Sequence, residues 1–297
     1  MHGSTPNAEA TSVACGVASY ALVEAALVDI PRLRDAPVPE GISALPPRFL
    51  RHGDEQTVVG LRAVLAAIAA HPEPRPSFAG YGVVAAACQS GRIATAQSLA
   101  MLRTSGGVAV SPHIVPQCSL HSVAGAVSVA LGMHGPNIGA SGGQHAVSEG
   151  LFTSLSLLAA DASLPGIWLV ISAWAQEPSL DAAGKHDCSP PNDARSGPIC
   201  RALAVAITAD AHAVAHTGTC RQLTLHMAAA IRLARSSAHD RRAADEILEF
   251  ARALDAGPAA SWSHACPWAA EIRLAPHAAV AGGSQAASRD IPQREAA

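Results

Sequence analysis

The residues with the most obvious chemical potential lie in Gly139-Ala140-Ser141-Gly142-Gly143, which spells G-x-S-x-G. In this pattern a serine stands on a sharp turn between a strand and a helix and acts as the nucleophile of many hydrolases. Such an enzyme also needs a histidine and a carboxylate, and the downstream candidates are Asp161, Asp181, Asp210, His212 and His216. Short glycine-rich matches often arise by chance. A serine hydrolase or acyltransferase that uses Ser141 is therefore kept as the alternative interpretation.

Two other pairs have spacings that could support chemistry. Cys118 and His121 lie three residues apart and could form a thiolate–imidazole pair, but we favour a buried, unreactive cysteine. His212 and His216 lie four apart and could share a metal ion on a helix, but no glutamate follows His212 as in H-E-x-x-H. This segment reads as a strand end, so surface histidines are the preferred interpretation. We predict no metal and no cofactor.

Gln144 is predicted to lie at the start of a helix that follows a short strand and a tight turn. The turn Gly135-Pro136 leads into a short predicted strand, 137–140, and a tight turn then precedes a long apolar helix that begins at Gln144. At a helix N-terminus, free backbone N–H groups and the positive end of the dipole can face a ligand. An enzyme would carry its nucleophile there, but an amide is not a nucleophile at neutral pH. The simpler interpretation is a glutamine that satisfies nearby backbone groups.

Strands and helices alternate on both sides of this turn. Helices are predicted after the capping residues Asp54 and Ser90, over 121–131 and from Gln144. Strands are predicted over residues 12–23, 81–88, 137–140, 167–173 and 199–209. The 167–173 segment is continuously apolar, as expected of a central strand that is covered on both faces. This alternation predicts an α/β layered fold.

After Thr217 the regular alternation of predicted strands and helices ends. Helices are predicted over 219–234 and 240–254, and a short strand over 271–274. We therefore predict a disordered segment at 1–10, a domain over 11–215, a helical extension over 216–277 that packs on it, and a disordered tail at 278–297.

Several pieces of the chain resemble, in order and spacing, the β-ketoacyl synthases of the thiolase superfamily. They are an arginine-rich run at 47–68, Ser111-Pro112, Ser119, Ala124-Gly125 and Gly135-Pro136-Asn137. The resemblance covers about residues 11–210 and implies a thiolase-like layered fold, mainly its N-terminal half, with a mixed sheet and helices on both faces. The family's second α/β half, with its two catalytic histidines, is not recognisable. The run from His216 to Thr219 is only a near match to one histidine motif.

This resemblance places Gln144 where the family has its active-site cysteine, which is similar to the chain-length factors, the non-condensing partners of type II ketosynthases. It implies a subunit of a 3-oxoacyl-[acyl-carrier-protein] synthase complex that is not catalytic alone. Its partners would be a ketosynthase and an acyl carrier protein, in polyketide, polyene or fatty-acid-type biosynthesis. The implied acyl pocket includes Ser141, Gly142, Gly143, Gln144 and Phe152. The implied partner interface comprises Met133, His134, Gly135, Pro136, Asn137 and Ile138. A scaffold without any acyl tunnel stays open.

Composition narrows the class of protein further. Hydrophobic residues make up 49% of the chain and charged residues 14%, which favours a buried core over disorder. The net charge of -3 gives no electrostatic footprint for nucleic acid. No secretory leader pattern and no long uninterrupted apolar run is present, so we expect no membrane span. The seven cysteines show no paired zinc spacing, and we expect them to be mostly reduced, as in the cytoplasm.

Overall fold

The computed structural model describes residues 12–40, 42–46, 48–71, 75–141, 143–181, 197–209, 221–227, 242–257, 260–268 and 270–276, without the side chains of Gln117 and Ser141. The disordered segments predicted at 1–10 and 278–297, and the domain boundary predicted at 215, lie outside these ranges. Within them, no helix is long and apolar enough to cross a membrane. The same ranges contain no cluster of three or more His, Cys, Asp or Glu side chains that could hold a metal ion.

One eight-stranded sheet organises the described residues, in the order β3-β2-β4-β5-β1-β6-β8-β7. The strands are β1 (Ser12–Ala26), β2 (Gly82–Ala87), β3 (Asn137–Ser141), β4 (Gly166–Trp174), β5 (Ile199–Ala209), β6 (Arg221–Met227), β7 (Trp262–Ala265) and β8 (Ala270–Pro276). Strand β2 runs parallel to β3 and β4, and all the other pairs are antiparallel. The sheet is therefore mixed, as the resemblance implied.

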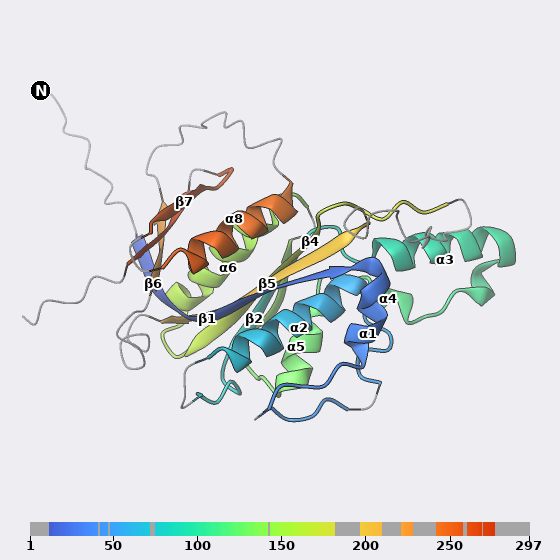
Figure 1. Ribbon diagram of the computed structural model, residues 1–297, viewed down its shortest axis with the longest axis horizontal. Coiled ribbons are helices and arrows are strands. Elements are labelled where there is room, and N and C mark those ends of the chain that lie inside the picture. Colours follow the sequence, from blue (N-terminus) through green and yellow to red (C-terminus); the bar gives the residue numbers. More distant parts are fainter. Residues whose placement is uncertain are drawn as a thin grey trace, which may run out of the picture.

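Helices cover both faces of this sheet (Figure 1). Helices α2 (Glu55–Ala69) and α5 (Ser122–Leu131) pack on one face, and α6 (Ala146–Ala160) and α8 (Ala243–Asp255) on the other. Successive residues of β4 serve opposite faces: Trp168 packs in the core under α2, and Leu169 in the core under α6. Every residue of β4 is buried, which explains its continuously apolar sequence and confirms the prediction of a central strand.

The C-terminal part of the chain corrects one prediction. Residues 221–227, expected within a helix over 219–234, form strand β6, which pairs with both β1 and β8. Burial alternates along β6: Arg221, Leu223 and Leu225 are buried, and the residues between them are less so. Pairing on both sides satisfies the backbone of β6, which outweighs local helix propensity. The predicted helix over 240–254 is confirmed as α8, and the predicted strand over 271–274 lies within β8.

An arm extends away from the layered body. It consists of α3 (Arg92–Ser105), the 3-10 turn η2 (Gly107–Ala109) and the short helix α4 (Ile114–Gln117), and α3 reaches the right-hand end of the molecule in Figure 1. Ile93 is the only buried residue of α3. The remaining short helices, η1 (Leu27–Asp29) and α1 (Ile30–Arg34), connect β1 to the segment before α2.

Candidate functional site

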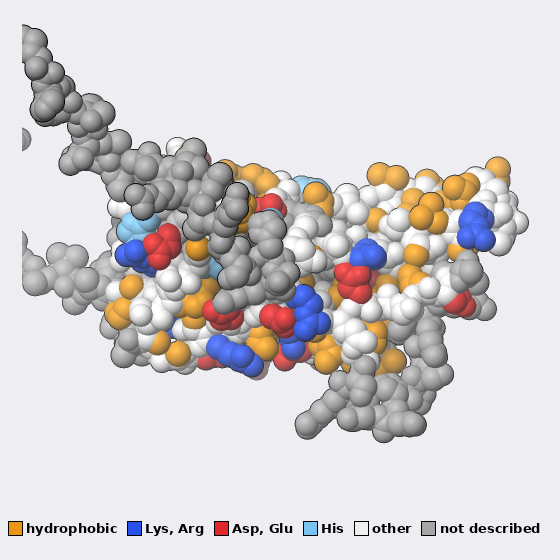
Figure 2. Space-filling model, turned by 90° about the horizontal axis from the view of Figure 1, so that it is seen from above, with side chains coloured by type: hydrophobic (Ala, Val, Ile, Leu, Met, Phe, Trp, Pro, Cys, Tyr) orange, Lys and Arg blue, Asp and Glu red, His pale blue; other side chains and the backbone are white. Residues whose placement is uncertain are grey.

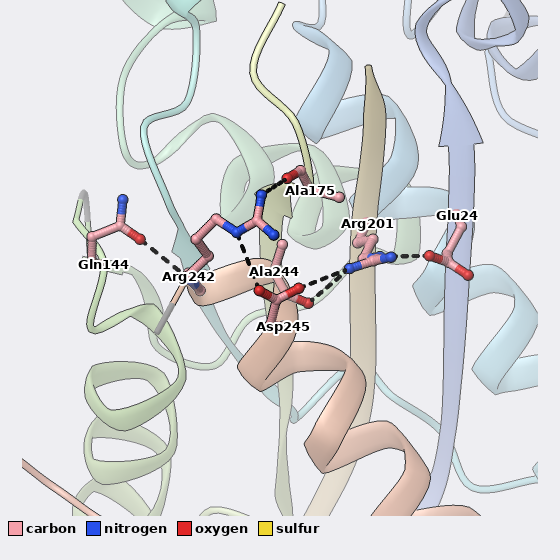
Figure 3. Close-up of polar contacts among 8 residues, drawn as sticks. Glu24, Gln144, Ala175, Arg201, Arg242, Ala244 and Asp245 are labelled. Carbon is pink, nitrogen blue, oxygen red and sulfur yellow. Dashed lines mark hydrogen bonds and ion pairs between the residues drawn. The ribbon is translucent and has the colours of Figure 1, made fainter. Parts of the chain in front are cut away.

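Gln144 lies in the turn between β3 and α6. Helix α6 begins at Ala146, two residues later than the sequence predicted, and His145 is its N-cap residue. The side-chain Oε1 of Gln144 accepts a hydrogen bond of 3.3 Å from the backbone N–H of Ala243 (Figure 3). Ala243 is the first residue of α8, whose N-cap residue Arg242 makes no side-chain capping bond. Gln144 therefore satisfies one of the free N–H groups at the start of α8.

A cavity of about 260 Å³ opens beside Gln144. It lies beyond the C-terminal ends of the neighbouring parallel strands β2 and β4 and is also bounded by the first residues of α8. Its lining includes Cys88, Gln144, Trp174, Glu177, Arg242 and Ala244. Ligands of open α/β sheets bind outside the carboxyl ends of the strands, so the cavity has the location expected of a binding site. The turn that carries Gln144 lies in the segment that the sequence analysis singled out. The opposite wall of the cavity is formed by the first residues of α8.

The charged groups around this cavity are paired. Arg242 donates to the carbonyl oxygen of Ala175 at 3.0 Å and to Asp245 at 3.2 Å, as Figure 3 shows. Asp245 also lies 3.6 Å from Arg201, which in turn contacts Glu24 on β1 at 2.5 Å. At the other side of the cavity Arg92 forms an ion pair with Glu177. The network links β1, β5, the end of β4 and the start of α8, so it fixes the cavity wall in place.

Cys88 is a site residue that the sequence did not single out. It follows the last residue of β2, is only 6% exposed and lines the cavity. Burial, with a contribution from Glu177, raises the pKa of the Cys88 thiol to about 11, and Arg92 lowers it less. The thiol is therefore protonated at neutral pH, and a protonated thiol is a poor nucleophile. Its position at the end of a buried strand was the one signal that could have found it.

The predicted pocket residues do not all meet at this cavity. Gly143 and Gln144 lie in the turn, Ser141 ends β3, and Gly142 lies outside the described residues. Phe152 lies further along α6, where its ring packs edge to face against Trp268 with centroids 5.9 Å apart. Phe152 is not part of the cavity lining. Its assignment to an acyl tunnel stays a prediction.

The triad required for a serine hydrolase at Ser141 does not assemble within the described residues. Asp161 follows the far end of α6, about 22 Å away by the 1.5 Å rise of a 15-residue helix. It accepts hydrogen bonds from Ser163, which lower its pKa. Asp181 lies after β4 and is exposed. The candidates Asp210, His212 and His216 fall outside the described residues.

A serine–histidine contact does occur elsewhere, between Ser148 on α6 and His264 on β7. Ser148 Oγ lies 2.7 Å from His264 Nε2, and the His264 ring stacks on that of Trp262. Ser148 is only 2% exposed and does not line the cavity at Gln144. The contact joins β7 to α6, and we assign it a structural role.

Cys118 and His121, the other predicted pair, occupy separate environments. The Cys118 side chain packs against Gly91, where an added Cβ would lie 2.5 Å from Cys118 Cβ, and burial raises the pKa of its thiol. The His121 ring lies against Gly125 on α5. These contacts favour the interpretation of Cys118 as an unreactive cysteine.

The predicted partner residues lead into and include the edge strand of the sheet. Strand β3 is first in the strand order and pairs only with β2 among the described strands. Met133 is 6% exposed and anchors the turn, whereas His134 is exposed and Asn137 and Ile138 are half-buried. A free edge strand can pair with a strand of another chain. The geometry is thus compatible with a partner at this edge.

Comparison with known proteins places this geometry in a known fold. A chain of a ketosynthase in complex with its chain length factor, from Xenorhabdus doucetiae, superposes with a TM-score of 0.51 and 12% identity, covering 89% of this chain and 99% of that chain. The chain has the thiolase-like fold of the ketosynthases.

Two further structures show weaker similarity to the thiolase-like chain. They are a beta-ketoacyl synthase from Burkholderia phymatum STM815 (TM-score 0.46, 15% identity, 72% of this chain) and the ishigamide ketosynthase/chain length factor (TM-score 0.43, 16% identity, 68% of this chain). The chain spans 63% of the length of each. Neither a scan of protein-family models nor a search of curated proteins found a match.

Proposed function

We propose that this thiolase-like chain is the non-condensing, chain-length-factor-like partner of a β-ketoacyl synthase. The observation that carries the proposal is Gln144. It stands where the family resemblance puts the nucleophilic cysteine, and its amide is engaged as a hydrogen-bond acceptor for α8. Condensation needs a thiolate to carry the acyl group and donors that stabilise the developing oxyanion. Cys88 lines the same cavity as Gln144, and burial raises the pKa of its thiol to about 11, which supports the proposal that the partner supplies the nucleophilic cysteine.

The ketosynthase subunit would dock at the free edge strand β3, through Met133, His134, Gly135, Pro136, Asn137 and Ile138. An edge strand offers unpaired backbone groups along its outer side, which a strand of the partner would satisfy. The heterodimer would shape the tunnel that holds the growing polyketide, polyene or fatty-acid-type chain. An acyl carrier protein would deliver that chain.

The described cysteines favour a reducing compartment for this complex. Among the described residues, Cys88, Cys118, Cys200 and Cys266 form no disulfide. Disulfides form and persist mainly in oxidising compartments. We therefore place the proposed heterodimer in the cytoplasm.

The test is an acyl-transfer assay on the chain alone and with the ketosynthase encoded nearest to its gene. Mass spectrometry of the intact chain, incubated with an acyl-loaded carrier protein, should show no covalent acyl group, whereas the co-purified pair should form product. The product length should depend on the presence of this chain. Covalent acylation and turnover by the isolated chain would overturn the proposal.

A fluorophosphonate probe separates the proposal from the hydrolase alternative in the same preparation. We expect no labelling of Ser141. Labelling that disappears in Ser141→Ala would establish a serine enzyme instead.

A further inference from the structure

Two adjoining cavities lie in the segment between α1 and α2, on the side of the sheet that α2 covers (Figure 1). Their volumes are about 360 and 370 Å³, within the range of small-molecule sites. Both are lined by Arg34, Asp35, Arg48 and Leu50. None of the residues that line them also lines the cavity at Gln144, so they form a separate location in the fold.

The first of these cavities has an apolar wall. Its apolar side chains are half-buried and pack against the core under α2; they are Val38, Ile42, Leu45 and Phe49. Such a wall can take up an aliphatic chain, because each methylene group that leaves water lowers the free energy. If each non-hydrogen atom takes roughly the 30 Å³ that a water molecule occupies in the liquid, the cavity has room for about twelve of them.

Two arginine side chains hold the segment around the cavities in place. The buried Arg62 guanidinium donates, at 2.6 to 3.4 Å, to the carbonyl oxygens of Leu33, Arg34, Ala36 and Pro37. Arg34 donates to the carbonyl oxygens of Leu50 and Gly53, both at 2.6 Å. The two arginines thus attach the segment to α2 and to itself. A site that is ordered before binding loses less conformational entropy when its ligand arrives.

The second cavity carries an excess of positive charge. Its lining contains three arginines, Arg34, Arg48 and Arg51, and one carboxylate, Asp35. Arg48 and Arg51 are exposed, and neither side chain forms a hydrogen bond or an ion pair with another residue that the structure describes. On the face shown in Figure 2, by contrast, most Lys and Arg side chains adjoin Asp or Glu side chains. The two guanidinium groups are therefore available to an anion.

The backbone brings these two arginines into one turn. The N–H of Arg51 donates to the carbonyl oxygen of Arg48 at 2.9 Å. Arg48 has a φ of 62°, in the left-handed region that a residue with a Cβ rarely adopts. Residues held in such conformations are concentrated at ligand sites, where the strain keeps a side chain in a required position. The turn therefore places both guanidinium groups at the same cavity.

We infer that the two adjoining cavities bind an amphipathic anion, namely the free carboxylate of a medium-length aliphatic chain. Arg48 and Arg51 bind the carboxylate, because the planar guanidinium group matches its geometry. The apolar wall formed by Val38, Ile42, Leu45 and Phe49 takes up the chain. Octanoate, with ten non-hydrogen atoms, fits the available volume. The ligand is bound without any bond being made or broken, and the inference does not depend on the proposed function.

The experiment is isothermal titration calorimetry of the full chain, in the assembly in which it purifies, with four probes. Octanoate carries both the head and the chain, butyrate a shorter chain, octylammonium the same chain with a positive head, and inorganic phosphate an anion without a chain. We expect octanoate to bind, and its affinity to exceed that of butyrate by about fourfold for each added methylene group. Octylammonium and inorganic phosphate should bind far more weakly.

Variants of the two arginines locate the site. Arg48→Gln/Arg51→Gln removes both charges, and we expect octanoate to bind roughly 100-fold more weakly, about tenfold for each charge-assisted hydrogen bond. Arg103→Gln is the matched control, because Arg103 is also an exposed arginine but lies on α3, outside both cavities, and it should bind octanoate like the wild type. Circular dichroism checks that each variant is folded.

Four outcomes would overturn the inference. They are no binding of octanoate to the wild type, unchanged affinity in the double variant, octylammonium binding as tightly as octanoate, and phosphate binding as tightly as octanoate. The third result would show that the chain alone adsorbs, and the fourth that the arginines form an anion site without an apolar part. None of them bears on the proposed function, which the acyl-transfer assay tests separately.

Discussion

Gln144 acts in the structure through its oxygen atom, which accepts a hydrogen bond from a residue 99 positions further along the chain. A cysteine or serine at this position would carry a potential nucleophile, whereas an amide can only donate and accept hydrogen bonds. Gln144 can therefore satisfy a nearby backbone group and also stand at the position where the resemblance places the active-site cysteine. The side chain supports the helix that forms the far wall of the cavity, and in the proposed function it also stands in the place of a nucleophile.

Substitution of Gln144 tests this support directly. Gln144→Ala removes the acceptor for the Ala243 N–H, and we expect the free energy of unfolding to fall by about 0.5–1 kcal/mol, the lower part of the range for a single hydrogen bond, because the side chain is exposed. Gln144→Glu keeps an acceptor and adds a negative charge at a helix N-terminus, so it should be neutral or slightly stabilising. Urea denaturation measures both. Equal stability of the alanine variant and the wild type would show that the hydrogen bond contributes nothing.

At the scale of elements, α8 is held at both of its ends by distant residues. Gln144 binds its first residue, while Tyr20 and Arg221 donate to the carbonyl oxygen of Leu254 at its last turn, at 3.0 and 3.2 Å. Between these ends Ile247 and Phe250 are fully buried in the core under α6. This attachment explains why a segment predicted as an extension belongs to the central sheet and its covering layer.

The Asp54 side chain binds both the start of helix α2 and Gly91 at the base of the arm, so its substitution should affect both elements. Asp54→Ala removes the N-cap of α2 and leaves the Gly91 N–H without its acceptor, so we expect a loss of about 2 kcal/mol or more in the free energy of unfolding. Asp54→Asn, which keeps one side-chain oxygen, should lose less. Hydrogen exchange should also become faster in residues 92–105 of the alanine variant. Unchanged exchange in α3 would mean that Asp54 does not fix the arm.

The sequence predicted elements well where one local pattern determines them. The continuous apolar run of β4 and the capping Asp54 both led to the observed structure. Strand β6 was missed because its alternation spans only seven residues, and the neighbouring alanines favour a helix. The bond between Gln144 and Ala243 could not be predicted, because it depends on the packing of α8 across the sheet. Cys88 was missed for the same reason, since only the neighbouring strand β4 and helix α8 complete the cavity around it.

At the scale of the whole molecule, helix α8 and the β7–β8 hairpin pack against α6 on one side of the sheet. Phe152 packs against Trp268 and Ser148 contacts His264, so the C-terminal residues cover much of that helix. The uncovered apolar surface lies instead on the arm and near β3. If the proposed partner binds, this face is where it would cover apolar surface.

We therefore expect the isolated chain to self-associate at micromolar concentration or to be poorly soluble, because the apolar arm is exposed. Size-exclusion chromatography with light scattering measures this. Leu99→Asp/Leu102→Asp should shift the chain toward a monomer, and Met227→Asp should not. A stable, monodisperse wild-type monomer would contradict the expected need for a partner.

The position of β1 has a consequence for how the chain reaches this structure. Strand β1 lies in the middle of the sheet, and both of its neighbours, β5 and β6, begin only at residues 199 and 221. The ribosome must therefore synthesise the whole segment from the end of β1 at Ala26 to the start of β5 at Ile199 before β1 can pair with either neighbour, and contacts so distant in sequence form slowly. During that interval an apolar strand with two open sides is exposed to other nascent chains, so productive expression should depend on chaperones or on slow translation.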